Sequence, residues 1–456
     1  MPASITLARA VAFALAVVPG AVCASQFDYS IYASVEHSDN ITLSDSNPIS
    51  QNVFSPGINF SYAQQGSIFQ ANVTGTLQYN DFLGHQFSDQ TQTALAAQAN
   101  WTVLPKRLDF TIEDYAGVEP VDSLASNSPD NQQQTNVLSL GPTLHLQFGD
   151  VMRAQIELHY LNSYASKVQD FDSSRGMVAF RLYRDLSPTD TLSLNVESQR
   201  VKFEHSAADE LIDGVDDTIA TPNYTRDEIY GRYTSTLAHF DADLLMGWSK
   251  IDFDHAPGDS KPLARATLGW QFTPRNSLSV TGAYEFSDAA QDMFLQPGQS
   301  IVNTLSENPT DFIDNPGGGI STGSMVIDSE VYLEKSLQLT YTYHTERLQL
   351  SLAPIYDKLT YLNDSTFNQS TRGGTVSLDY HVRPRTTLTG FVNAQRETYE
   401  SLARTDKTYR YGVDLGHQWT PHWSWHVSYI RQLRNSNALA QSYHENEVYF
   451  SVVFKR

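Results

Sequence analysis

Apolar and polar residues alternate with a period of two along much of this chain, which is the pattern of β-strands with one apolar face. From Phe27 to Val35 the odd positions are Phe, Tyr, Ile, Ala and Val, and the intervening positions are mostly polar. The pattern predicts about twenty strands, with boundaries uncertain by about two to four residues. The strands are expected to begin near residues 27, 53, 68, 91, 108, 135, 151, 174, 191, 224, 240, 262, 277, 328, 347, 372, 387, 406, 424 and 442.

The connectors between these segments alternate between short turns and longer polar loops. Five short turns place an apolar residue two positions before a proline: Val103-Leu104-Pro105-Lys106, Leu186-Ser187-Pro188-Thr189, Phe272-Thr273-Pro274-Arg275, Val382-Arg383-Pro384-Arg385 and Trp419-Thr420-Pro421-His422. Proline at the second position of a turn presets φ, so it ends one strand and starts the next. Four more turns are expected near Gly66, Gly149, His239 and Glu346. Hairpins with one tight and one loose end are typical of an up-and-down barrel whose rims face different compartments.

The alternation by itself is compatible with a soluble sandwich as well as with a barrel. Two features besides the connector asymmetry favour the barrel. Five tryptophans lie close to turn prolines and are candidates for an interfacial aromatic girdle: Trp101, Trp270, Trp419, Trp423 and Trp425. The last segment alternates apolar residues and ends in Phe454, as in the recognition segment of outer-membrane barrels. We therefore predict an all-β fold, a transmembrane antiparallel up-and-down barrel of about twenty strands in the cell outer membrane.

The first residues have the composition of a signal peptide. Arg9 precedes an apolar stretch from Ala10 to Val18, and Val22-Cys23-Ala24 fits a cleavage site with small residues. We expect a signal peptide at residues 1–24 and a single barrel domain at residues 25–456. Cys23 is the only cysteine of the chain, so the mature barrel is expected to have no disulfide and no thiolate metal site.

The net charge of −21 argues against binding of nucleic acid, because an acidic surface repels phosphates. Acidic residues crowd the predicted loop that contains Asp213, Asp216 and Asp217. That loop is either a solvated surface or a place where divalent cations bridge to lipopolysaccharide. The connector at residues 289–327 is unusually long, and such loops are often functional. It either folds into the barrel and narrows it or stays outside.

No motif in the sequence points to catalysis. Gly319-Ile320-Ser321-Thr322-Gly323 matches the nucleophile elbow of serine hydrolases, but no strand precedes it and no helix follows it. The thirteen histidines show no zinc-binding spacing, and no glycine loop for a nucleotide is present. We expect no enzyme activity, no metal and no cofactor.

The polar strand faces supply the candidate functional residues, because in a wide barrel they line the lumen. The candidate pore-lining residues are Arg153, Glu157, His159, Arg181, Tyr183, Glu197, Glu228, Arg232, Glu334, Gln338, Asp379, Asn393, Gln395, Arg410 and Asp414. Mixed charges, amides and aromatic rings suit a polar solute such as a sugar chain. The alternative is a wall whose opposite charges pair with one another and leave little passage.

Three segments in the N-terminal third resemble a family of bacterial outer-membrane barrels. They are Val35–Leu43, which is similar to the family's (T/S)-D-N-(I/V)-x-L segment, Ser55–Phe60, which is similar to its x-P-G-(I/F) strand, and Gln78-Tyr79-Asn80. The family is associated with exopolysaccharide operons and the PEP-CTERM sorting system and is also described as β-barrel porins. The resemblance implies an outer-membrane location and a part in polysaccharide export, and it carries over no catalytic residue.

We therefore expect a porin or export conduit, with exopolysaccharide as the transported polymer. A structural or adhesive scaffold with acidic extracellular loops is the alternative, and an outer-membrane hydrolase is a third. The expected partners are outer-membrane lipid and lipopolysaccharide, the barrel-assembly machinery and a polysaccharide, but not nucleic acid.

Overall fold

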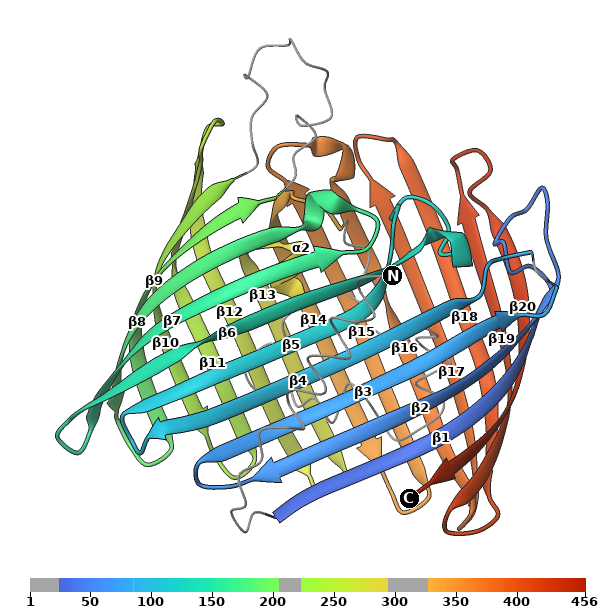
Figure 1. The fold of residues 1–456 in the computed structure, drawn as a ribbon, viewed down its shortest axis with the longest axis horizontal. Helices are drawn as coiled ribbons and strands as arrows, with labels where there is room; N and C mark the ends of the chain where they lie inside the picture. The colour runs from blue at the N-terminus through green and yellow to red at the C-terminus, as the bar shows by residue number, and fades with distance from the viewer. Residues whose placement is uncertain (1–23, 85, 205–222, 294–326) are drawn as a thin grey trace.

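The chain forms one closed β-sheet, as the computed structural model shows (Figure 1). The model describes residues 24–84, 86–204, 223–293 and 327–456. Twenty strands pair in an antiparallel manner with their neighbours in the chain, and β1 also pairs with β20. The sheet has no free edge, since the first and last strands complete each other's hydrogen bonds. The predicted fold class, an antiparallel up-and-down barrel of about twenty strands, is confirmed.

The strands have similar lengths and follow one another without an intervening domain. The first ten are β1 (Ala24–Ser38), β2 (Gln51–Gln65), β3 (Phe69–Phe82), β4 (Gln90–Leu104), β5 (Leu108–Pro120), β6 (Gln132–Phe148), β7 (Met152–Ala165), β8 (Ser173–Asp185), β9 (Asp190–Phe203) and β10 (Tyr224–Thr236). The other ten are β11 (Phe240–Phe253), β12 (Asp259–Thr273), β13 (Asn276–Asp288), β14 (Val331–His344), β15 (Leu348–Tyr361), β16 (Gln369–Arg383), β17 (Thr386–Tyr399), β18 (Arg404–Gln418), β19 (Trp423–Ser436) and β20 (Tyr443–Lys455). The described helical turns are η1 (Pro129–Asn131), η2 (Gln169–Phe171), α2 (Ala289–Asp292) and η3 (Ser365–Phe367).

Every strand begins within three residues of its predicted start, and the nine short turns lie where the sequence places them. The other end differs from the prediction in one respect. The connectors at residues 254–258 and 400–403 are nearly as short as the turns. The ladders continue further than the apolar pattern does, as Ile251 paired with Asp259 shows. Polar residues therefore extend the hairpins at this end instead of forming loops.

The two faces of each strand meet different surroundings. On β1, Phe27, Ile31 and Val35 are 55%, 50% and 45% exposed, whereas Tyr32 between them is 7% exposed. Exposed apolar side chains recur in this way around the sheet, and the opposite faces carry hydrogen-bonded polar groups. A barrel surface of this kind is solvated by lipid, and its polar side encloses the lumen.

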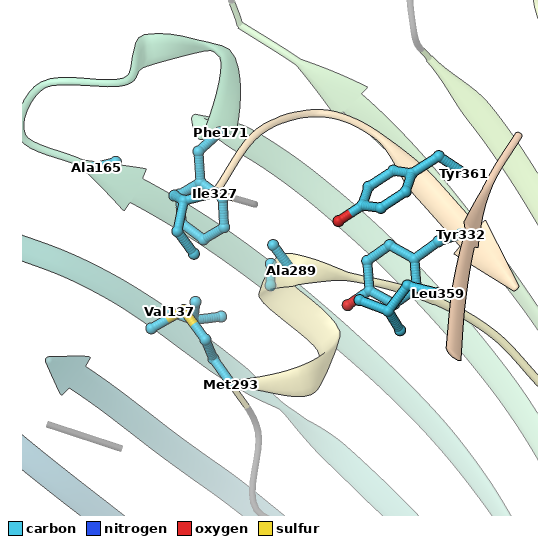
Figure 2. Close-up of a cluster of buried hydrophobic side chains, with 10 residues drawn as sticks. Val137, Ala165, Phe171, Ala289, Met293, Ile327, Tyr332, Leu359 and Tyr361 are labelled. Atoms are coloured by element: carbon cyan, nitrogen blue, oxygen red, sulfur yellow. The ribbon is translucent and has the colours of Figure 1, made fainter. Parts of the chain in front are cut away.

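One hairpin leaves the wall and turns into the lumen. Tyr284 is the last residue of β13 to pair with β12, and Glu285 to Asp288 pair only with β14. Helix α2 follows directly, and Ala289, Ala290 and the next residue after the helix, Met293, are buried against Val137 of β6 and Phe171. Figure 2 shows Tyr332, Leu359 and Tyr361 on the other side of Ala289, and Ile327 belongs to the same cluster. The described ends of the long connector thus fold inward.

Several predictions concern residues outside the described part of the chain. They are the signal peptide apart from its last residue, the acidic loop around Asp213, and the Gly319–Gly323 segment. Strand β1 begins at Ala24, one residue before the predicted start of the mature barrel. None of the helices in the described ranges has the length and apolar character to cross a membrane.

Candidate functional site: the pore wall and the constriction at its mouth

The structure places all fifteen candidate pore-lining residues on the inward strand faces. Their positions alternate with exposed apolar residues such as Leu158, Val178, Val196, Ile229 and Val413. Arg153, Glu157, His159, Arg181, Tyr183, Glu197, Glu228 and Arg232 lie on β7–β10, and Glu334, Gln338, Asp379, Asn393, Gln395, Arg410 and Asp414 lie on β14 and β16–β18. Their role in lining a pore stays a prediction.

The charges on β7–β9 form pairs along the wall. Arg181 donates to Glu157 at 2.9 Å and to Glu197 at 3.2 Å, so it connects β8 to both of its neighbours. Arg153 and Asp185 form a further pair of adjacent strands at 2.6 Å. Pairs between neighbouring strands neutralise the wall without reaching across the lumen.

The same arrangement continues on the following strands. Arg232 donates through Nε to Asp243 at 2.7 Å, and Arg265 contacts Glu285 at 2.6 Å. On the far side of the barrel, Asp414 accepts from Ser428 at 2.5 Å and lies 3.1 Å from His426. These charges therefore pair with one another around the circumference of the wall, and the passage that this leaves stays a prediction.

Sequence reasoning missed a set of inward tyrosines that are hydrogen-bonded to glutamines. The described residues form four such pairs: Tyr32 with Gln78 at 2.8 Å, Tyr115 with Gln98 at 2.7 Å, Tyr183 with Gln155 at 2.9 Å and Tyr443 with Gln432 at 2.6 Å. Only Tyr183 was a candidate. The other three lie on the inward faces of their strands, as the candidate residues do. The alternation of apolar and polar positions could therefore have identified them.

A second missed feature is the contact between β13 and β8, which are not neighbours in the sheet. Arg175 of β8 and Asp288 at the end of β13 form an ion pair at 2.7 Å, and both side chains are 2% exposed. Tyr224 of β10 donates to the same carboxylate at 2.6 Å. The other inward ion pairs of the described residues lie within one strand or between adjacent strands, whereas the pair of Arg175 and Asp288 joins strands that are not neighbours. It holds the inward hairpin across the mouth, and we call the region around it the constriction.

Apolar packing supports the constriction on both sides of that ion pair. Phe286 of β13 is buried against Val201, Tyr224 and Ile251, which lie on β9, β10 and β11. Asp288 also caps α2, since its carboxylate accepts from the backbone N–H groups of Ala290 and Gln291. An acidic N-cap satisfies the free N–H groups at a helix start. One side chain thus begins the helix and anchors it to the wall.

Carboxyl groups at the constriction have raised pKa values. Burial raises the pKa of Asp328 to about 7, and the nearby carboxylates of Glu330, Asp170 and Asp364 add to this shift. The pKa of Glu330 is raised as well, mainly by burial and then by Asp364. In α2, burial and the neighbouring Glu334 raise the pKa of Asp292 well above its usual range. Burial favours the neutral form of a carboxyl group. The packed constriction therefore favours the protonated form of these three side chains.

The predicted aromatic girdle lies at the turn end of the barrel. Trp101, Trp270, Trp419 and Trp423 are exposed there, and Trp425 packs its ring against His417 at a centroid distance of 5.7 Å. Such a position is that of an interfacial belt, although the interfacial role itself stays a prediction. Among the described residues, no group of His, Cys, Asp and Glu is arranged to hold a metal ion.

A closed sheet of this size with an apolar exterior and a polar interior is an outer-membrane β-barrel. Residues 360–456 match the model of a family described as "Putative beta-barrel porin 2". This match covers β16–β20, at the opposite end of the chain from the segments that carry the resemblance found in the sequence. No curated protein matches the chain.

Solved structures of outer-membrane transporters resemble the chain in fold. The ferric enterobactin receptor (PfeA) from Pseudomonas aeruginosa in complex with enterobactin is 9% identical, with a TM-score of 0.49, and the match covers 94% of this chain and 81% of that chain. The FrpB iron transporter from Neisseria meningitidis is 8% identical, with a TM-score of 0.46 and coverage of 94% and 82%. At this identity the likeness does not extend to what this chain binds.

Proposed function

We propose that this barrel is a passive conduit for a polar, largely uncharged solute, with exopolysaccharide as the polymer it carries. The observation that supports this most is the neutralised polar wall, in which Arg181 pairs with Glu157 and Glu197 and the partly exposed Tyr183 donates to Gln155. Aromatic faces stack on sugar rings, and amides exchange hydrogen bonds with hydroxyl groups. Charges that are neutralised along the wall neither repel nor trap such a chain.

The constriction makes the proposed conduit narrow at the loop end. The inward hairpin is attached to β8 through Arg175 and packs against the described loop segments. Outer-membrane barrels have their longer loops on the extracellular side, so the narrow end faces outward. A narrow extracellular end would hinder free entry of large solutes from the medium while a selected polymer passes.

Planar-bilayer recordings of the purified barrel test this proposal. Stable conductance steps are expected, and neutral oligosaccharides are expected to interrupt the current more than charged oligomers of equal length. A silent bilayer at high protein density would contradict the conduit.

Silence would instead support the structural or adhesive scaffold, which the apolar packing across the mouth also favours. The absence of enzyme activity is also part of the proposal. Any hydrolytic activity that disappears in a Ser321→Ala variant would contradict it and favour the hydrolase.

A further inference from the structure

Six consecutive strands carry a basic residue on the outer face of the barrel near the loop end. They are Lys335 on β14, Lys358 on β15, Arg372 on β16, Arg396 on β17, Lys407 on β18 and Arg431 on β19, and we call them the basic belt. Each shares the strand parity of exposed apolar residues, for example Leu337 with Lys335 and Val392 with Arg396. The belt therefore lies on the lipid side of the wall.

The register places five of these positive charges directly opposite another one, and Arg431 lies opposite Tyr411. Lys335 is directly opposite Lys358, and Arg396 is directly opposite both Arg372 and Lys407. Like charges directly opposite each other destabilise a sheet, because neighbouring strands are only about 4.8 Å apart. The fold alone gives no reason for such a row, so an anion from outside the chain is the natural counterpart.

The chain itself supplies little negative charge to the belt. Among the described residues, Lys358 pairs with Glu400 at 2.7 Å, and the other five form no ion pair. Arg372 lies 5.4 Å from the ring centre of Tyr356, and Lys335 lies 5.2 Å from that of Tyr284. These contacts hold two of the side chains against the wall and leave their charge available to an outside group.

The hydrogen bonding of Arg431 differs from that of outward basic residues on β9 and β11. The Nε atom of Arg431 is buried and has no hydrogen-bond partner within the described ranges. In contrast, Arg200 on β9 pairs with Asp254, and Lys250 on β11 pairs with Asp252. Arg200 and Lys250 are thus neutralised by the chain, whereas five of the six belt residues form no ion pair within the described ranges.

The belt lies at the level of lipid headgroups. Outward tyrosines come next along the strands toward the middle of the barrel, as Tyr409 does after Lys407 and Tyr429 does before Arg431. Tyrosine concentrates at the boundary between the hydrocarbon core and the headgroups. The long-loop end of a barrel is extracellular, so the belt faces the outer leaflet.

We propose that the basic belt binds the phosphate groups of outer-leaflet glycolipid. The arginine guanidinium matches phosphate oxygens in a bidentate way, and lysine adds a point charge. The net charge of −21 repels anionic lipid from the molecule as a whole, so attraction requires a local surface of this kind. The lipid phosphates also remove the repulsion between the directly opposed side chains.

The test compares two triple variants of the full-length barrel. Arg372→Gln, Arg396→Gln and Lys407→Gln together remove half of the belt. Arg200→Gln, Lys202→Gln and Lys250→Gln together are the matched control, since they remove equal charge from the outer faces of β9 and β11. Binding of bisphosphorylated lipid A, of dephosphorylated lipid A and of inorganic phosphate is measured in neutral detergent by native mass spectrometry.

We expect the belt variant to bind lipid A about tenfold more weakly, a loss that higher salt reproduces in the wild type by screening. The control variant shows whether the loss depends on the position of the removed charges. Dephosphorylated lipid A shows whether binding depends on the phosphate groups. Equal losses in both variants, or equal binding of dephosphorylated lipid A by the wild type, would overturn the proposal. Competition by millimolar inorganic phosphate would overturn it too, by assigning the surface to a free anion.

Thermal unfolding checks that the belt variant is folded and provides a second readout of lipid binding. Without lipid, the belt variant should be at least as stable as the wild type, because repulsion across the strands is relieved. Lipid A should raise the Tm of the wild type and of the control variant but not that of the belt variant. A rise of equal size in all three would contradict the assignment.

Discussion

Arg175 on β8 and Asp288 at the end of β13 form a buried ion pair at 2.7 Å between strands that are not neighbours in the sheet. The carboxylate of Asp288 also accepts from Tyr224 and caps α2. A single side chain therefore connects the wall, the inward hairpin and the start of the long connector. Breaking this contact should affect the mouth of the barrel more than its wall.

Replacing Asp288 by Asn should widen the mouth. Breaking a buried ion pair leaves an uncompensated charge and costs about 3–5 kcal/mol. We expect the inward hairpin to detach and the single-channel conductance to rise. Asp185→Asn is the matched control, because its pair with Arg153 is part-exposed and joins adjacent strands. An equal rise in both variants would show that the ion pair does not hold the constriction.

Conductance should depend on pH through Asp328. Its pKa in the folded barrel is raised to about 7, above the value of about 4 in an unfolded chain. The protonated form of Asp328 therefore stabilises the inward packing. This stabilisation is fully present below about pH 4 and is lost as the pH rises through 7. Glu330 and Asp292 are shifted in the same direction. We expect lower conductance at pH 5 than at pH 8.

The variant Asp328→Asn should weaken this dependence, because its amide stays neutral at every pH. Recordings of the wild type and the variant across the same pH range make the comparison. A wild-type conductance that is constant from pH 5 to pH 8 would be inconsistent with a protonated constriction.

Gly412→Ala should destabilise the barrel, whereas Gly390→Ala should be tolerated. A Cβ atom at Gly412 would lie 2.7 Å from the carbonyl oxygen of Tyr429 and 2.9 Å from the ring of Phe391. At Gly390 the nearest atom would be 3.9 Å away. Overpacking of this kind costs about 1–3 kcal/mol. Denaturant unfolding in detergent measures the difference, and equal midpoints would refute the steric argument.

Tyr183 should contribute to sugar binding through its ring. It is partly exposed to the lumen, donates to Gln155 at 2.9 Å and lies with its ring centre 5.0 Å from the Arg153 guanidinium. Tyr183→Phe keeps the ring and Tyr183→Leu removes it. We expect current blockade by neutral oligosaccharides to weaken several-fold in the leucine variant only.

The control for this experiment is Tyr115→Leu, since Tyr115 is fully buried and cannot stack on a solute. If its blockade falls as much as that of Tyr183→Leu, the effect comes from the altered wall and not from stacking. Recordings at matched salt and voltage make the comparison.

The alternation in the sequence predicted the barrel and the direction of its side chains. Glu157 and Arg181, for example, were assigned to the lumen because each lies between apolar neighbours, and the structure joins them at 2.9 Å. The identity of partners was harder to predict, since pairs such as Tyr32 and Gln78 depend on register between strands. Register is set by the whole ladder and by turn geometry.

The sequence by itself determined which residues form strands, where the turns lie and which face of each strand is apolar. These are local properties, because the period of two acts within a few residues. Only the tertiary structure decided that β13 leaves the wall and that Asp288 meets Arg175. It also decided that Lys335 lies opposite Lys358 and that Arg396 lies opposite Arg372 and Lys407. Such contacts arise when the sheet closes, since closure brings together residues that are far apart in the chain.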